Sequence, residues 1–87
     1  MMVRVLFFAY LRERCGVRET TVDLAEGASV DDLRHVLRAR FALPEGTPIR
    51  FAVNRAYVDS THVLHENDEV ALIPPVSGGA PTRGARR

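Results

Sequence analysis

The chain has 87 residues and a mass of 9.7 kDa, which is the size of one small domain. A hydrophobic share of 46% and a charged share of 26% are ordinary for a globular protein and exclude a disordered chain. The longest apolar run, Val5 to Leu11, is too short to cross a membrane, and the start does not resemble a secretion signal. We therefore expect a soluble, cytoplasmic protein.

The charge is unevenly distributed along the chain. All twelve basic residues are arginine, with no lysine. Residues 1–79 contain nine arginines and eleven acidic residues, a net charge of −2, whereas residues 80–87 contain three arginines and no acid, a net charge of +3. The mildly acidic body lacks the basic face that nucleic-acid binding needs, so we expect no nucleic-acid partner.

The first quarter of the sequence predicts two strands joined by a short helix. Residues 2–10 are rich in β-branched and aromatic side chains, which favour a strand. Residues 11–15 are good helix formers, and Gly16 suits a helix C-terminus. Residues 18–25 predict a second strand. The two strands should form a hairpin-like pair.

One longer helix is predicted after Ser29, whose hydroxyl can cap the free backbone donors of the first turn. Asp31 and Asp32 place negative charge at the positive end of the helix dipole. The apolar positions form a single stripe, which consists of Val30, Leu33, Val36, Leu37 and Phe41. A loop rich in proline and glycine then ends the helix.

Three more strands are predicted, at residues 49–54, 56–59 and 68–73, with Asn54-Arg55 as the turn between the first two. Pro74-Pro75 ends the last strand because proline cannot donate a ladder hydrogen bond. This order of elements predicts an α+β domain with about five strands and one main helix across one face of the sheet. Nothing after residue 73 has an apolar period, so we expect residues 74–87 to form an extended, mobile tail.

Strand alternation predicts what lies on the sheet face that the helix leaves open. Arginine is rarely buried unpaired, so Arg4 marks its parity in the first strand as the open one, a parity that continues to Tyr10. The open face should then present six apolar residues together, namely Leu6, Phe8, Ala52, Tyr57, Ala71 and Ile73. A contiguous patch of this kind is typical of a partner surface. The alternative is a bulge that shifts the alternation and puts some of these residues in the core.

Conventional catalytic groups are sparse. His62 and His65 lie in a predicted loop without a third metal ligand, and His35 lies on the exposed side of the helix. Cys15, the single cysteine, excludes an internal disulfide and has no activating base, so we expect a buried or half-buried thiol and no nucleophile. We expect no metal site, no bound cofactor and no catalysis by this chain alone.

The segment from Pro74 to Gly79 contains a diglycine, Gly78-Gly79. A chain end without side chains can pass through a narrow channel into the active site of another protein. If Gly79 were terminal, its carboxylate could be adenylated and converted to a thioester or thiocarboxylate. Most Gly-Gly pairs are linkers, but this one follows a Pro-Pro strand end on a predicted domain of one helix and five strands.

Five segments together carry a family resemblance: residues 5–9, 11–13, 52–54, 67–71 and 74–79. The sequence resembles the ubiquitin-like β-grasp sulfur carriers, specifically the small subunit of molybdopterin synthase (the MoaD family). The Pro-Pro-Val-x-Gly-Gly ending favours this branch over the thiamine branch. The resemblance implies a β-grasp domain with a mixed sheet at residues 1–75, a flexible carrier tail at 76–79 and a disordered basic extension at 80–87.

The resemblance also implies a mechanism and partners. A ubiquitin-activating-type (MoeB-type) enzyme would use ATP to adenylate the Gly79 carboxylate, and a sulfur donor would convert it to a thiocarboxylate. The tail would enter the large catalytic (MoaE-type) subunit and give its sulfur to cyclic pyranopterin monophosphate in molybdenum-cofactor synthesis. The implied site residues are Gly78 and Gly79 for sulfur carriage and, for partner binding, Phe8, Arg12, Tyr57, Ile73, Pro75 and Val76. Arg12 is expected to contact the activating enzyme.

One feature departs from the family, in which Gly-Gly normally ends the chain, because eight residues follow Gly79 here. Either a processing protease cuts after Gly79, or residues 80–87 are an artificial addition, or the protein has lost carrier function and kept partner binding. Sulfur delivery to thiamine or tRNA, and ubiquitin-like modification of other proteins, are the alternative functions.

Overall fold

The computed structural model describes residues 1–46 and 48–75, which fold into one five-stranded sheet with two helices. The elements in chain order are β1 (Met2–Phe7), α1 (Tyr10–Cys15), β2 (Glu19–Asp23), α2 (Val30–Phe41), β3 (Arg50–Val53), β4 (Ala56–Val58) and β5 (Glu69–Ile73). The predicted α+β class, with about five strands and one main helix, is confirmed.

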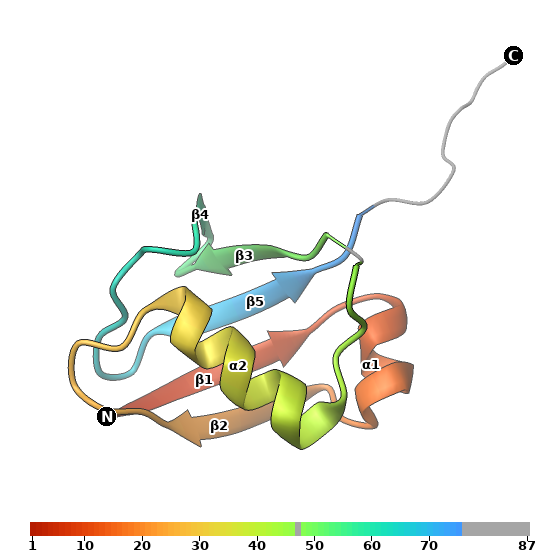
Figure 1. The fold of residues 1–87 in the computed structure, drawn as a ribbon, viewed down its shortest axis with the longest axis horizontal. Helices are drawn as coiled ribbons and strands as arrows, with labels where there is room; N and C mark the ends of the chain where they lie inside the picture. Colours follow the sequence, from red (N-terminus) through yellow and green to blue (C-terminus); the bar gives the residue numbers. More distant parts are fainter. Residues whose placement is uncertain (47, 76–87) are drawn as a thin grey trace, which may run out of the picture.

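The sheet is mixed, and its strand order is β2-β1-β5-β3-β4. The central strands β1 and β5 run parallel, and the three other pairs are antiparallel. In Figure 1, α2 crosses one face of the sheet, and α1 lies near the end of β1. The described chain leaves the sheet from the central strand β5, so the segment that follows starts next to the middle of the sheet.

Both predicted hairpins are confirmed. Strand β1 pairs with β2, and β3 pairs with β4, in antiparallel register. Asn54 and Arg55 connect β3 to β4 with φ angles of 51° and 74°. Two successive residues with positive φ form the kind of two-residue turn whose twist matches that of the flanking strands. This turn sets the β3–β4 register, with Ala52 opposite Tyr57.

Helix α2 begins as the sequence predicts. The Ser29 hydroxyl accepts a hydrogen bond from the Asp32 backbone N–H at 3.3 Å, and the Asp32 carboxylate accepts one from the Ser29 N–H at 2.9 Å. This reciprocal capping box satisfies two backbone donors at the helix start. The helix ends at Phe41, and Ala42 follows in the left-handed region with a φ of 53°.

The core lies between α2 and the covered face of the sheet. Alternate residues of β1 and the apolar stripe of α2 supply most of it, with Val3, Val5, Phe7, Leu33, Leu37, Val70 and Leu72 all at most 1% exposed. Leu64 lies in the connection that the sequence predicts as a loop around His62 and His65, yet it is a core residue, 1% exposed. An isolated β-bridge between Ser29 and Val63 holds this connection next to the start of α2. The Leu64 N–H also donates a hydrogen bond to the Ala28 carbonyl at 2.9 Å.

The first strand is shorter than predicted. It ends at Phe7, and the chain turns at Ala9, which has a φ of 54°. Tyr10 is therefore the first residue of α1 and does not continue the open-face alternation, which corrects the prediction. The second strand covers Glu19–Asp23 and not residues 18–25.

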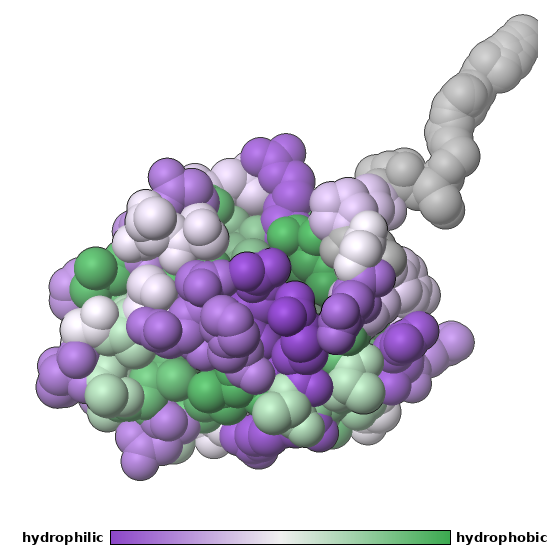
Figure 2. All heavy atoms as spheres, in the orientation of Figure 1, coloured by the Kyte–Doolittle hydropathy of each residue, from purple (hydrophilic) through white to green (hydrophobic). Residues whose placement is uncertain are grey.

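Neither helix in the described ranges has the length and apolar character that a membrane span requires. Figure 2 shows hydrophilic side chains spread over the helix-bearing face, with apolar patches between them. The predicted tail begins with Pro74 and Pro75, which are described, whereas its remainder, residues 76–87, lies outside the described residues.

Candidate functional site

A row of four residues crosses the open face of the sheet. The strand register places Leu6 beside Ala71, Ala71 beside Ala52, and Ala52 beside Tyr57. These residues belong to β1, β5, β3 and β4, so they form one continuous line over the middle of the sheet. All four are residues that alternation predicts for this face.

This row forms the floor of a hollow with a volume of about 370 Å³. Phe8 and Ile73 extend the lining beyond the row, and Arg55 and Glu69 complete it. We call this the open-face hollow. All six apolar residues predicted for the patch line it, so the alternative in which a bulge moves some of them to the covered face is wrong. Ala52 differs in being only 6% exposed, because a methyl group is easily covered by its neighbours.

The aromatic residues of the hollow remain accessible. Phe8 is 38% exposed and Tyr57 is 56% exposed, and Ile73 is half-buried. The Arg50 guanidinium carbon lies 4.0 Å from the centre of the Tyr57 ring, a cation–π contact that orients the ring. This contact is not among those expected from the sequence. Its only sequence signal is the two-residue turn at Asn54, which fixes the register that brings Arg50 diagonally next to Tyr57. Exposed aromatic residues beside arginine are typical of protein interfaces.

Arg12 lies on the rim of this surface. Its Nε donates a hydrogen bond to the Phe7 carbonyl at 3.0 Å, and its guanidinium lies 5.6 Å from the centre of the Phe8 ring. Arg12 also lines a neighbouring depression that shares Leu6 and Phe8 with the open-face hollow. The side chain is thus held at an exposed edge of the apolar surface, where it can contact a second protein.

A polar network closes the other end of the open face, and sequence reasoning missed its central member, Asp68. Asp68 is 9% exposed, and its carboxylate accepts hydrogen bonds from Asn54 Nδ2 at 2.9 Å and the His65 N–H at 2.8 Å. Asn54 Oδ1 in turn accepts from the Glu69 N–H at 3.0 Å. Glu69 pairs with Arg4. The network fastens the β3–β4 turn to the start of β5.

The predicted tail residues are only partly within the structure. Pro75 is exposed, two residues beyond the end of β5. Val76, Gly78 and Gly79 lie outside the described residues, so their predicted roles stay predictions. Strand β5 nevertheless links the two parts of the predicted site, because Ala71 and Ile73 line the hollow immediately before this segment begins.

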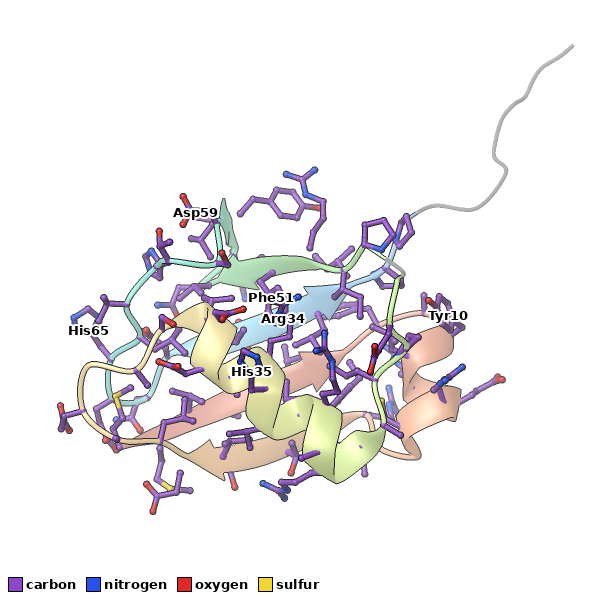
Figure 3. All side chains as sticks on the ribbon, viewed as in Figure 1. Tyr10, Arg34, His35, Phe51, Asp59 and His65 are labelled. Carbon is purple, nitrogen blue, oxygen red and sulfur yellow. The ribbon has the colours of Figure 1, made fainter. Side chains whose placement is uncertain are left out.

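The other candidate groups do not form a reactive centre. His35 on α2 and His65 in the connection before β5 lie well apart in Figure 3. Within residues 1–46 and 48–75, no three histidine, cysteine or acidic side chains are arranged to hold a metal ion. Burial raises the pKa of the partly buried Cys15 thiol, although nearby Arg14 opposes the shift, so this thiol stays protonated at neutral pH. Asp59 accepts hydrogen bonds from Thr61, which lower the pKa of its carboxyl group.

Comparisons of sequence agree with the predicted resemblance. The model of the ThiS family matches residues 5–79, a range that ends at the second glycine of the diglycine. The molybdopterin synthase sulfur carrier subunit of Chlamydomonas reinhardtii is 42% identical over 91% of this chain and 100% of its own length. The protein of the same name from Escherichia coli is 43% identical over 90% of this chain and 100% of its own length.

Solved structures share the fold. The putative molybdopterin converting factor subunit 1 of Pyrococcus furiosus has a TM-score of 0.80 and 31% identity, covering 87% of this chain and 99% of its own. SAMP1 of Haloferax volcanii has a TM-score of 0.81 and 28% identity, covering 91% of this chain and 100% of its own. A complex of subunits 1 and 2 of the molybdopterin-converting factor of Helicobacter pylori contains a chain with a TM-score of 0.68 and 28% identity. The match covers 91% of the present chain and 100% of the Helicobacter pylori chain. The family match and the full-length relatives together show that this chain belongs to the ThiS family of ubiquitin-like β-grasp proteins, on its molybdopterin synthase small-subunit (MoaD) branch.

Proposed function

We propose that this chain is the sulfur-carrier subunit of a molybdopterin synthase and that it carries sulfur on the carboxylate of Gly79. The observation that carries the proposal is the position of β5. This strand lines the open-face hollow through Ala71 and Ile73, and the diglycine follows its last residue by only a few positions. One strand thus connects a docking surface to the group that would react. The names of the curated relatives support this function.

The chemistry explains why a diglycine suits this task. A carboxylate is a poor electrophile, so an activating enzyme would use ATP to join it to AMP and release pyrophosphate. A sulfur donor would then displace AMP and leave a thiocarboxylate. From Pro74 to Gly79 the chain can reach roughly 20 Å at about 3.3 Å per residue. Glycine side chains add no bulk, so such an end can enter a narrow active site of the large subunit.

We propose the large catalytic subunit as the partner of the open-face hollow. The Helicobacter pylori neighbour, whose structure is a complex of the two subunits, supports this assignment. Phe8, Tyr57 and Ile73 would be the apolar anchors, with Pro75 and Val76 continuing the contact toward the active site. Arg12, at the rim, would contact the MoeB-type activating enzyme.

Residues 80–87 must be absent for this chemistry, because a Gly79 in amide linkage has no carboxylate. We propose that a protease removes them. The end of the family match at Gly79 supports this boundary. Residues 1–79 would then be the active carrier and residues 1–87 its inactive precursor.

Reconstitution tests the function. Residues 1–79 bearing a Gly79 thiocarboxylate are mixed with the large subunit of a molybdopterin synthase and cyclic pyranopterin monophosphate, and dithiolene formation is measured. We expect product from the thiocarboxylate form and none from the matched carboxylate form or from residues 1–87. Tight binding of the large subunit without sulfur transfer would contradict carrier function and leave only a binding module.

The second candidate function is attachment to other proteins as a modifier. It is favoured by the likeness to SAMP1 of Haloferax volcanii. A second structure from the same organism gives the full name, small archaeal modifier protein 1. Because this chain has no lysine, it cannot form chains linked through its own lysines. Peptides from cell extracts in which Gly79 is joined to a lysine side chain by an isopeptide bond would support this function. Failure to find such peptides in cells that contain abundant carrier would argue against it.

A further inference from the structure

Two acidic side chains lie on the surface around the open-face hollow, and both pair with the same arginine. Glu69 lines the hollow, and Glu19 lines the neighbouring depression that contains Phe8. Arg4 forms an ion pair with Glu69, and its Nε lies 3.4 Å from a carboxylate oxygen of Glu19. This one guanidinium therefore offsets half of the negative charge that the two glutamates bring to the open face.

Four further arginines belong to the same surface. Arg55 lines the hollow, and Arg12 and Arg18 line the neighbouring depression. Arg50 lies over the ring of Tyr57, which is part of the hollow. All four arginines are exposed, and none of them forms an ion pair within residues 1–46 and 48–75. Their charges are therefore available to an approaching partner.

Charge is thus segregated between the open face and the rest of the domain. Around the hollow, five arginines and two glutamates give a net charge of +3, whereas the other four arginines and nine acidic residues of residues 1–79 give −5. The sequence total of −2 conceals this positive border, because the border requires five strands and turns to be brought together. We call it the arginine rim, which consists of Arg4, Arg12, Arg18, Arg50 and Arg55.

The segregation gives the molecule a preferred direction of approach. Helix α2 covers the opposite face of the sheet, so the rim and the hollow share one side of the molecule (Figure 1). A negatively charged surface attracts the rim and repels the rest of the domain, which favours encounters that bring the hollow first. Charges at the border of an interface mainly set the association rate and the choice of partner, whereas the apolar centre supplies affinity.

We propose that the open-face hollow docks on an apolar protein surface bordered by acidic side chains, and that Arg50 and Arg55 pair with these acids. Both arginines lie on the hairpin that carries the Tyr57 anchor. The identity of this partner as the large subunit rests on the function proposed above, whereas the acidic border is inferred from the arginine rim. A nucleic acid suits the face less well, because the charge of −5 on the rest of the domain would repel its phosphates. A symmetric dimer of this chain would place two arginine rims against each other.

The test is the association of residues 1–79 with the molybdopterin synthase large subunit of the same organism, followed by surface plasmon resonance. The described domain ends at Pro75, so a chain that ends at Gly79 retains all of it. We expect association to slow by roughly tenfold as ionic strength rises from about 0.1 M to about 1 M, because the Debye length falls from about 10 Å to about 3 Å. Association that does not slow over this range would overturn the proposal.

Matched charge reversals locate the effect on the surface. Arg50→Glu and Arg55→Glu should each slow association by roughly threefold or more at about 0.1 M salt, and by much less at about 1 M. Arg40→Glu is the control, because it changes the net charge equally and Arg40 also lies over an aromatic ring, that of Phe41, at 5.2 Å, but on α2. Equal slowing by all three variants would overturn the proposal. Arg50→Lys keeps the charge and should associate at the rate of the unmodified chain.

Failure of this inference differs from failure of the proposed function. Binding of the large subunit that is insensitive to salt and to the reversals at Arg50 and Arg55 would overturn the acidic border and leave the carrier function standing. Failure of the unmodified chain to bind at either ionic strength would overturn the partner and the border together. Circular dichroism of each variant checks that the fold is retained.

Discussion

Individual side chains on the open face differ in what they do for the molecule. Phe8 is 38% exposed and Tyr57 is 56% exposed, and neither belongs to the core, so both are available for a partner. Asn54 and Asp68 instead hold the β3–β4 turn against β5 through hydrogen bonds of 2.9 and 3.0 Å that involve the Asn54 side chain. Substitutions should therefore separate binding from stability at the level of single residues.

Replacing an apolar anchor by arginine should abolish partner binding and leave the fold intact. Phe8→Arg or Ile73→Arg puts an unpaired charge in the open-face hollow and should weaken large-subunit binding by roughly thirtyfold or more, equivalent to about 2 kcal/mol. Val63→Arg is the control, because Val63 is 45% exposed and does not line the hollow. Isothermal calorimetry measures the affinity and circular dichroism the fold. Normal binding by both hollow variants would show that the partner uses another face.

Asn54→Ala should destabilise the domain strongly. It removes two side-chain hydrogen bonds, one of them to a carboxylate, and places alanine at a φ of 51°. We expect a loss of about 2–4 kcal/mol in the free energy of unfolding, measured by urea denaturation. Asn67→Ala is the matched control, since Asn67 has a φ of 68° but its side chain makes no hydrogen bond within the described residues. Equal losses would mean that backbone strain alone accounts for the effect.

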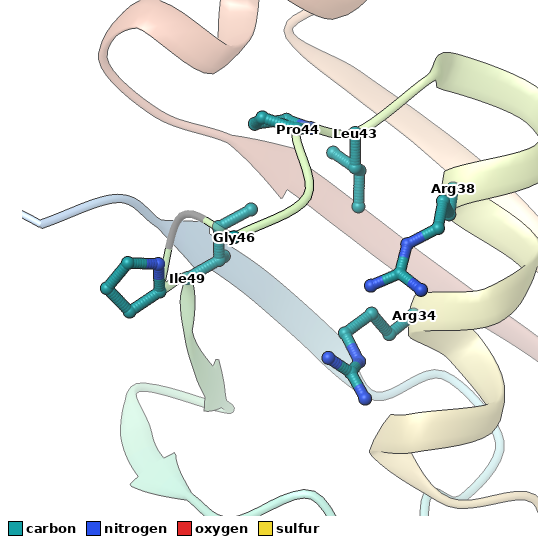
Figure 4. A pocket seen from close by; sticks show the side chains of 7 residues that line it. Arg34, Arg38, Leu43, Pro44, Gly46 and Ile49 are labelled. Carbon is teal, nitrogen blue, oxygen red and sulfur yellow. The ribbon is translucent and has the colours of Figure 1, made fainter.

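At the scale of elements, α2 presents different side chains on its two faces. Leu33 and Leu37 are fully buried against the sheet, whereas Arg34 and Arg38 line a depression between the helix and the loop that leads to β3 (Figure 4). The start of the helix is fixed by the Ser29–Asp32 capping box and by the Asp31 N–H, which donates to the Ser60 carbonyl at 3.0 Å. The position of both helix faces therefore depends on this first turn.

Ser29→Ala should remove the side-chain cap of α2 and lower the free energy of unfolding by about 1 kcal/mol. Ser60→Ala is the matched control, because the Ser60 hydroxyl has no hydrogen-bond partner in the described part of the chain and its backbone carbonyl is retained. Chemical denaturation of both variants gives the comparison. If Ser60→Ala costs as much as Ser29→Ala, the capping box does not provide the stabilisation that we assign to it.

At the scale of the whole molecule, local features were predictable and long-range ones were not. The alternation of β1 and the turn at Asn54 identify the open face and one hairpin, because each depends on neighbouring residues. The parallel β1–β5 pairing joins residues more than sixty positions apart, and no local pattern encodes it. Only the family resemblance implies a mixed sheet. The Asn54–Asp68 hydrogen bond and the burial of Leu64 could not be predicted for the same reason, because both depend on residues that are distant in the sequence. The depression beside Arg34 and Arg38 has no sequence signal either, because it requires Ile49 and the preceding loop to lie opposite α2.

The claim that Gly79 carries sulfur is tested most directly by an intact-mass measurement on untagged protein recovered from its native cells. We predict a species that ends at Gly79, with a fraction of the molecules heavier by one exchange of oxygen for sulfur. The heavier, sulfur-bearing form should disappear when Gly79 is replaced by alanine, because we expect the activating enzyme to require the glycine end. A population in which every molecule retains residues beyond Gly79, with no sulfur-bearing form, would contradict the account.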